Sequence, residues 1–192
     1  IVGEESGENI AYEILFFLKK KINYELYGIG GKKLNYLGLK EIFSHNELSI
    51  MGLMEVLPKV PKLIKLIYKT YFNILEVDPD LIITIDAPDF TFRVLKKIKN
   101  KNSKLKTLHI VAPSVWAWKS NRAKKIARFV DNLFVLFPFE KKYFIPHGIK
   151  TTFIGHPFIK NSYNKDKITI APFKINKDII SIFPGSRKAE IE

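Results

Sequence analysis

Residues 81–92, with the sequence LIITIDAPDFTF, join an unbroken apolar segment to a stretch that contains two aspartates and a proline. Apolar residues at consecutive positions predict a strand buried on both faces, as in a parallel sheet covered by helices. The spacing of Phe92, Leu95 and Ile98 predicts a helix over residues 89–100 that turns one apolar face to the core. A strand that leads directly into a helix is the repeating unit of an α/β fold.

The same order of strand, loop and helix recurs along the chain. Further strands are expected at 1–2, 24–31, 107–113, 132–139, 151–157 and 178–183, and further helices at 9–21, 53–73, 120–131 and 140–144. We therefore predict an α/β fold with a parallel, Rossmann-like sheet.

Apolar density changes along the chain and predicts how it is divided into domains. Residues 1–160 are expected to form one domain, 161–177 a linker rich in Asn, Lys and Pro, and 178–192 the start of a second α/β domain that is cut short. Only two strand residues precede Gly3, whereas a buried strand needs about 4–8, so we expect the first strand to begin before Ile1.

The composition excludes several classes of protein. With 46% hydrophobic and 27% charged residues, the chain is globular rather than disordered. The absence of cysteine excludes disulfides, iron–sulfur clusters and thiolate zinc sites, and the four histidines lack metal-ligand spacing, so we expect no metal and no cofactor. No apolar run reaches the ~18 residues of a membrane-spanning helix.

The positive charge is carried almost entirely by lysine. The net charge is +13, and only four residues are arginine, namely Arg93, Arg122, Arg128 and Arg187. Sequence-specific nucleic-acid recognition favours the planar fork of arginine, so we expect no nucleic-acid partner. An anionic membrane surface or a phosphorylated substrate suits this charge at least as well.

Residues 53–73 form a basic amphipathic segment. Four lysines share one helical face, Lys59, Lys62, Lys65 and Lys69, and apolar residues fill the opposite one, among them Leu57, Val60, Leu63, Ile64 and Ile67. Such a helix could lie on an anionic membrane surface or contact acyl chains. It could equally be a core helix with a solvated lysine face.

Ligands of open parallel sheets bind outside the carboxyl ends of the strands, so the loops there hold the candidate site residues. In the first loop, GEESGE, carboxylates and a serine suit sugar hydroxyls, which makes Glu4 and Ser6 candidates for substrate binding. The alternative is that Ser6 is only the N-cap of the following helix. The glutamates of this loop disfavour phosphate.

Asp86 has two interpretations. Asp86 and Asp89 stand three residues apart before a helix, which is typical of a capping box with Asp86 as N-cap. Alternatively, a carboxylate on a rigid strand end that is partly shielded from water by Ala87 and Pro88 could act as a general base.

Two later loops also carry chemistry. The loop APSVWAWKSNR, residues 112–122, holds both tryptophans, and Trp116 could form a wall against a sugar or a base, or a hydrophobic plug between helices. Gly185, Ser186 and Arg187 stand between a strand and the start of a helix, where backbone amides and a guanidinium would bind a diphosphate.

Seven motifs follow one another in the order of a known family. They are GEESGE (3–8), MGLMEV (51–56), DAPDF (86–90), APSVWAW (112–118), PFE (138–140), GHP (155–157) and PGSR (184–187). Together they resemble the lipid-A-disaccharide synthases, inverting glycosyltransferases of the two-domain GT-B type. The chain departs from the family pattern at Glu8, where the family has Asp, and at Ala112, where it has Ser.

The resemblance implies a reaction between UDP-2,3-diacylglucosamine and 2,3-diacylglucosamine 1-phosphate that yields the lipid A disaccharide phosphate and UDP. Asp86 matches the proposed base, and Gly185, Ser186 and Arg187 match the diphosphate site. The residues expected to bind substrate are Glu4, Ser6, Asp89, Ser114, Trp116 and His156.

The resemblance also implies a place for the protein and several alternatives. It implies a cytoplasmic protein, peripheral on the inner face of the membrane, and a partner chain is an option for the missing second domain. The alternatives are another GT-B enzyme acting on a UDP-sugar, an inactive acceptor-binding fragment, and a basic nucleic-acid-binding module.

Overall fold

The computed structural model describes residues 1–49, 56–116 and 121–157, and within these the side chains of all residues except 49 and 56–59. The strands are β1 (Leu26–Gly30), β2 (Leu39–Ser44), β3 (Leu81–Ile85), β4 (Lys106–Ile110), β5 (Asn132–Val135) and β6 (Lys150–Phe153). The α-helices are α1 (Glu5–Leu18), α2 (Lys32–Tyr36), α3 (Asn46–Ser49), α4 (Val56–Val77), α5 (Pro88–Lys101), α6 (Asn121–Ile126) and α7 (Lys141–Phe144), with 3₁₀ turns at Pro138–Glu140 and Ile145–His147.

Every strand in the described part of the chain runs parallel to its neighbours. β1 pairs with β2, and β3, β4, β5 and β6 pair in that order. Val2 forms a parallel bridge to Ile85 and donates its amide hydrogen to the carbonyl of Ile29 at 3.1 Å. The first residues of the chain therefore lie between β1 and β3, and the sheet order is β2, β1, residues 1–2, β3, β4, β5, β6.

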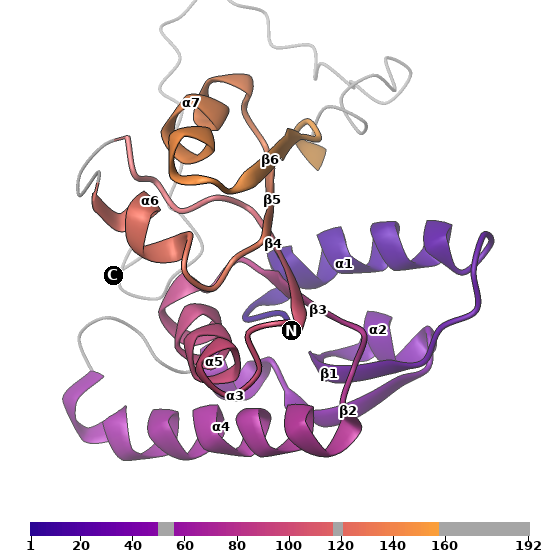
Figure 1. Cartoon of the computed structure of the whole chain (residues 1–192). Coiled ribbons are helices and arrows are strands. Elements are labelled where there is room, and N and C mark those ends of the chain that lie inside the picture. The colour runs from indigo at the N-terminus through magenta and orange to yellow at the C-terminus, as the bar shows by residue number, and fades with distance from the viewer. Residues whose placement is uncertain (50–55, 117–120, 158–192) are drawn as a thin grey trace, which may run out of the picture. The chain divides into compact units, whose positions relative to one another are not determined.

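Helices cover both faces of this sheet, which confirms the predicted α/β fold (Figure 1). α1 and α2 lie on one side and bury Ala11 and Leu34 against Ile85 and Ile110. α4 and α5 lie on the other side. Consecutive residues of β3 alternate between these two cores, which is why the strand needs an unbroken apolar sequence.

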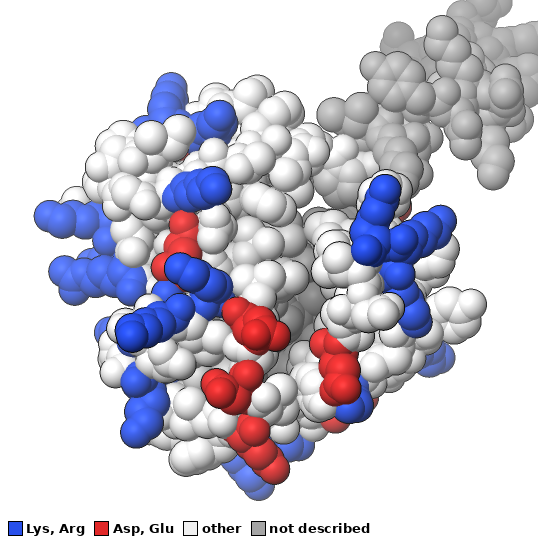
Figure 2. Space-filling view, turned by 45° about the vertical axis from the view of Figure 1, so that its right-hand side comes forward, with Lys and Arg blue, Asp and Glu red and all other residues white. Residues whose placement is uncertain are grey.

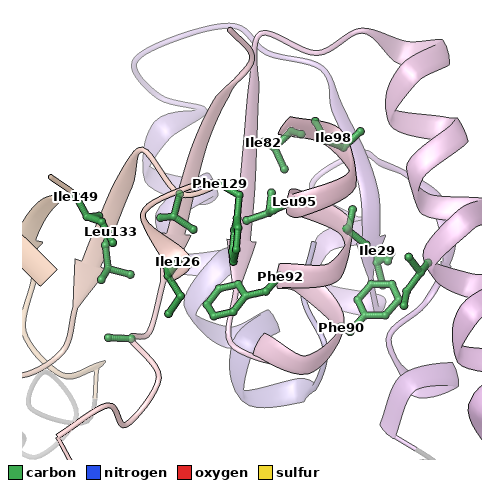
Figure 3. Close-up of a cluster of buried hydrophobic side chains, with 14 of the residues drawn as sticks. Ile29, Ile82, Phe90, Phe92, Leu95, Ile98, Ile126, Phe129, Leu133 and Ile149 are labelled. Atoms are coloured by element: carbon green, nitrogen blue, oxygen red, sulfur yellow. The ribbon is translucent and has the colours of Figure 1, made fainter. Parts of the chain in front are cut away.

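The larger core lies under α5, as Figure 3 shows. The predicted apolar face of this helix is confirmed, because Leu95 and Ile98 are 0% exposed and Phe92 is 8% exposed. These side chains pack in one cluster with Ile82 from β3 and Leu133 from β5. Each fully buried aliphatic side chain stabilises the fold by roughly 1.5–3 kcal/mol, so this cluster holds the strand ends of the sheet at fixed positions.

Some boundaries differ from the sequence predictions. The first helix begins at Glu5, not at residue 9, and its acidic first turn suits the positive end of a helix. The helix expected over 120–131 ends at Ile126. Neither α2 nor β2 was predicted, because only Leu34 is buried in the short α2 and only Phe43 in the edge strand β2.

No helix in the described ranges is long and apolar enough to cross a bilayer. Residues 1–157 form one compact unit. The predicted linker at 161–177 and the predicted second domain at 178–192 lie outside the described residues, and the division of the chain into these domains stays a prediction.

Candidate active site

The chain order of the strands reverses between residues 1–2 and β3. In parallel sheets such a switch point opens a crevice at the carboxyl ends of the strands, where ligands bind. The loop after Val2 and the loop after β3 meet here, because a β-carbon added to Gly3 would lie 2.1 Å from that of Ala87. Gly7 lies against the carbonyl of Ile85, 3.4 Å from an added β-carbon. Two of the predicted site loops are therefore neighbours.

Backbone strain gathers at this edge of the sheet. Asp86 and Ala87 follow β3 with φ angles of +53° and +45°, and Val111 follows β4 with a φ of +73°. Such left-handed conformations cost non-glycine residues roughly 1–2 kcal/mol each. Hydrogen bonds hold them in place: the Asp86 amide donates to Ile110 and the Val111 amide to Phe134, at 3.0 and 3.1 Å.

Asp86 does not cap the helix that follows it, so the capping-box interpretation is wrong. Ala87 is the N-cap of α5, and no side chain caps this end. The Asp86 carboxylate accepts a hydrogen bond through Oδ1 from the Ala87 amide at 2.8 Å, its only hydrogen bond within the described residues. Oδ2 is thus left for another donor. Thr91 fixes the turn by donating to the carbonyls of Asp86 and Ala87 at 3.1 and 3.0 Å.

Asp89 lies one step further, in the first turn of α5. Its side chain is 95% exposed, and Oδ1 lies 3.7 Å from Nη2 of Arg122 in α6. An ion pair this exposed contributes little to stability. Arg122, which was not among the predicted site residues, thus lies near the start of α5.

Glu4 and Ser6 stand on the opposite side of the switch point. Glu4, not Ser6, is the N-cap of α1, and no side chain caps this end. The prediction that Ser6 caps the helix is therefore wrong. Both side chains are exposed beside the loop of Asp86.

A row of aromatic rings lines the loops after the next three strands. Trp116 meets Phe139 edge to face at 5.1 Å, Phe139 stacks on Phe137 at 5.7 Å, and Phe137 meets His156 at 5.6 Å. We call these four residues the aromatic row. Phe137 and Phe139 are 42% and 44% exposed. Trp116 and His156 were predicted from the sequence. The two phenylalanines were not, although their place just after β5 is a signal.

Glu140 explains how the aromatic row keeps its shape. The residue is 2% exposed, and its Oε2 accepts a hydrogen bond from the Phe137 amide at 2.8 Å. Burial raises the pKa of this carboxyl group. The PFE motif is therefore a structural turn that presents Phe137 and Phe139 to solvent. Ser114 is exposed in the loop after β4.

Three further predicted residues lie outside the part of the chain that the structure describes. Gly185, Ser186 and Arg187, expected to bind a diphosphate, lie beyond the described ranges, and their role stays a prediction. Within those ranges, no group of three or more His, Asp or Glu side chains could hold a metal ion.

The basic amphipathic segment forms α4, and its apolar residues divide between core and surface. Ile67 is 3% exposed and belongs to the core, so its predicted contact with acyl chains is wrong, and Leu63 packs partly against the same core. Val60 and Ile64 are exposed. The side chain of Leu57 lies outside the described residues.

The exposed apolar side chains of α4 form a continuous stripe. Its members recur every three or four residues, namely Val60, Ile64, Tyr68, Phe72 and Leu75, and are 36–61% exposed. Lys62, Lys65 and Lys69 are exposed on the same helix. We call the five apolar residues the α4 stripe. Figure 2 shows one face of the molecule, on which basic side chains lie mostly at the periphery and acidic ones gather nearer the centre.

Comparison with known proteins agrees with the resemblance seen in the motifs. A model of the lipid-A-disaccharide synthetase family matches residues 1–192. The lipid-A-disaccharide synthases of Rickettsia felis and Rhodospirillum centenum are 44% and 36% identical to this chain. These alignments cover 100% of this chain and 50% and 49% of the relatives, so the chain spans about half the length of the curated relatives it matches. The family model covers the chain from end to end, and the chain belongs to the lipid-A-disaccharide synthetase family.

Proposed function

We propose that the protein containing this chain transfers a sugar from UDP-2,3-diacylglucosamine to 2,3-diacylglucosamine 1-phosphate, forming the lipid A disaccharide phosphate and UDP. The observation that carries the proposal is the position of Asp86. It stands at the switch point of the sheet, with Oδ1 held by the Ala87 amide and Oδ2 accepting no hydrogen bond from the described residues. A carboxylate held this way can receive a proton without rearranging its own support.

Asp86 acts as the general base in this proposal. The 6-hydroxyl oxygen of the acceptor attacks the anomeric carbon of the donor, and Asp86 takes the hydroxyl proton. The new carbon–oxygen bond forms as the bond between the anomeric carbon and UDP breaks, and that electron pair leaves with UDP. Attack opposite the leaving group inverts the anomeric configuration. A positioned base contributes roughly 10²–10⁴-fold to the rate.

Both substrates place negative charge in the site. The departing UDP gains charge, which Arg187 and the amides of Gly185 and Ser186 stabilise in this proposal. The acceptor carries a phosphate on its first carbon. In this proposal Arg122, whose Nη2 lies 3.7 Å from Asp89 Oδ1, binds that phosphate. Guanidinium groups bind phosphate oxygens in pairs, which would also orient the acceptor.

The remaining predicted residues bind the sugar rings and hydroxyls in this proposal. In this proposal Glu4 and Ser6, both exposed at the start of α1, hydrogen-bond sugar hydroxyls, and Ser114, exposed in the loop after β4, does the same. The aromatic row offers flat apolar faces, against which pyranose rings pack. Trp116 and His156 hold the two ends of this row.

The α4 stripe supports binding to the inner face of the cytoplasmic membrane. Apolar side chains with lysines beside them match what an anionic lipid surface requires. Acylated substrates reside in such a membrane, so a peripheral protein would meet them there. This part of the proposal rests on Val60 and Ile64, and not on Ile67.

Product formation with defined substrates tests the proposed function. In the longest natural chain that contains this sequence, both acylated substrates should give disaccharide phosphate and UDP. Replacing the donor with UDP-N-acetylglucosamine should abolish or sharply reduce turnover. Equal turnover of the two donors would favour another UDP-sugar enzyme. Salt-sensitive binding to unrelated DNA, without transfer, would favour a nucleic-acid-binding module.

A further inference from the structure

A buried carboxylate, that of Glu8, lies at the end of the loop that contains Glu4 and Ser6. Glu8, in the first turn of α1, is 4% exposed, and His45, which follows β2, is 6% exposed. Glu8 Oε2 lies 3.3 Å from His45 Nε2. Glu8 Oε1 accepts a hydrogen bond from the amide of Leu34 in α2 at 3.1 Å. One side chain thus joins three elements that are distant in sequence.

Gly31 makes the room for this contact. A β-carbon at this position would lie 2.6 Å from His45 Nε2 and 2.8 Å from Glu8 Oε2, closer than such atoms approach one another. The backbone of Gly31 is extended, with a φ of −156°, so any residue could adopt its conformation. Space alone therefore requires glycine here.

The contact anchors the first turn of α1 to the protein body. No side chain caps the N-terminus of α1, where amide hydrogens usually require a partner. The Glu8 amide donates to the carbonyl of Glu4 at 3.1 Å, so Glu8 holds the loop through its backbone and the protein body through its side chain. Gly3, at the start of the same loop, contacts Ala87 beside Asp86.

We infer that Glu8 is a positioning residue: with His45 and Gly31 it fixes the loop of Glu4 and Ser6 against the loop of Asp86. The catalytic consequence of this role rests on the proposed function, whereas the ordering of the loop does not. The carboxylate reaches His45 because it is a glutamate. The aspartate of the family pattern would end about 1.5 Å short, the length of one carbon–carbon bond.

Five variants separate positioning from general stability. Glu8→Ala, His45→Ala and Gly31→Ala each disrupt the contact, whereas Glu8→Gln keeps an acceptor for the Leu34 amide. Asp131→Asn is the control, because it weakens another partly buried network, with Lys99 and Thr107, at the amino ends of β4 and β5. All are made in the longest natural chain that contains this sequence, and their melting temperatures are recorded.

Hydrogen exchange of the amides of residues 8–11, the first amides of α1 that an i to i−4 hydrogen bond can protect, is the first measurement. We expect roughly tenfold faster exchange in the three disruptive variants, the effect of losing one hydrogen bond to a charged group. Glu8→Gln and Asp131→Asn should exchange these amides as the wild type does. Unchanged exchange in Glu8→Ala would overturn the inference, and it would do so whether or not the protein forms disaccharide.

Steady-state kinetics is the second measurement. In Glu8→Ala and Gly31→Ala, kcat/KM should fall by roughly 10- to 100-fold, because small displacements in a site are costly. Glu8→Gln should recover most of the activity, and Asp131→Asn should keep it despite a lower melting temperature. An equal fall in Asp131→Asn would reduce Glu8 to a stabilising residue. If the wild type forms no disaccharide, the proposed function fails and the exchange experiment still decides the role of Glu8.

Discussion

Gly3 and Ala87 touch so closely that a β-carbon on Gly3 would lie 2.1 Å from the β-carbon of Ala87. The two residues belong to loops separated by more than eighty positions in the chain. Their contact closes the switch point of the sheet and sets the separation between Glu4 and Ser6 on one side and Asp86 on the other.

Gly3→Ala should force these loops apart. We expect a loss of about 1–3 kcal/mol in the free energy of unfolding, typical of an overpacked site, together with a fall in turnover. Gly7→Ala is the matched control, because its β-carbon would meet its nearest neighbour at an ordinary 3.4 Å. Urea denaturation measures the first effect. A Gly3→Ala variant as stable as Gly7→Ala would contradict the contact.

Ala87→Gly should raise the free energy of unfolding and lower kcat. Glycine relieves left-handed strain of about 1–2 kcal/mol and costs about 0.5–1 kcal/mol in chain entropy, so a gain of up to about 1.5 kcal/mol is expected. The freer backbone then holds Asp86 less firmly and lowers kcat. Asp78→Gly, at another position with positive φ (44°) before β3, should leave kcat unchanged. Equal kinetics for the two variants would show that the strain at Ala87 has no part in catalysis.

His109 makes the fold sensitive to acid. Its side chain is 0% exposed, and burial lowers the pKa from 6.5 to about 3. The unfolded chain binds this proton first, so the stability that neutral His109 contributes is complete above pH 6.5 and is lost as the pH falls towards 3. The full effect is of the order of 5 kcal/mol. His109→Gln should flatten the dependence of unfolding free energy on pH in this window, and an unchanged slope would refute the assignment.

The α4 stripe should bind anionic vesicles. Ile64→Ser and Phe72→Ser should each weaken binding to phosphatidylethanolamine–phosphatidylglycerol vesicles by about tenfold, or about 1.4 kcal/mol, because each removes apolar contact area. Phe17→Ser is the control, since Phe17 is 64% exposed but lies on α1, across the sheet. Vesicle co-sedimentation of all three variants measures this. If Phe17→Ser weakens binding as much as Phe72→Ser, the contact is not specific to α4.

Much of the fold could be predicted because its signals are local. The unbroken apolar sequence of residues 81–85 indicates a strand buried on both faces, and the spacing of Phe92, Leu95 and Ile98 indicates the helix that covers it. β2 was not predicted, because an edge strand buries few side chains and its sequence therefore shows little apolar pattern. The switch point itself depends on the bridge of Val2 to Ile85, which no local pattern encodes.

The candidate site could be predicted only in part. Asp86 is visible in the sequence because a carboxylate directly follows a buried strand, but its left-handed backbone is not. The pair of Glu8 and His45 joins residues 37 positions apart and depends on the room left by Gly31. Ile67 shows the converse error, because a helical pattern marks an apolar face without indicating whether core or solvent covers it.

Asp86→Asn tests whether Asp86 is the general base. Asparagine tolerates the left-handed backbone and keeps an oxygen for the Ala87 amide, so it removes the base and little else. Measured as disaccharide formation at saturating substrates, kcat should fall by roughly 10²–10⁴-fold, while Asp89→Asn should keep most of it. Near-normal turnover by a correctly folded Asp86→Asn would contradict the account.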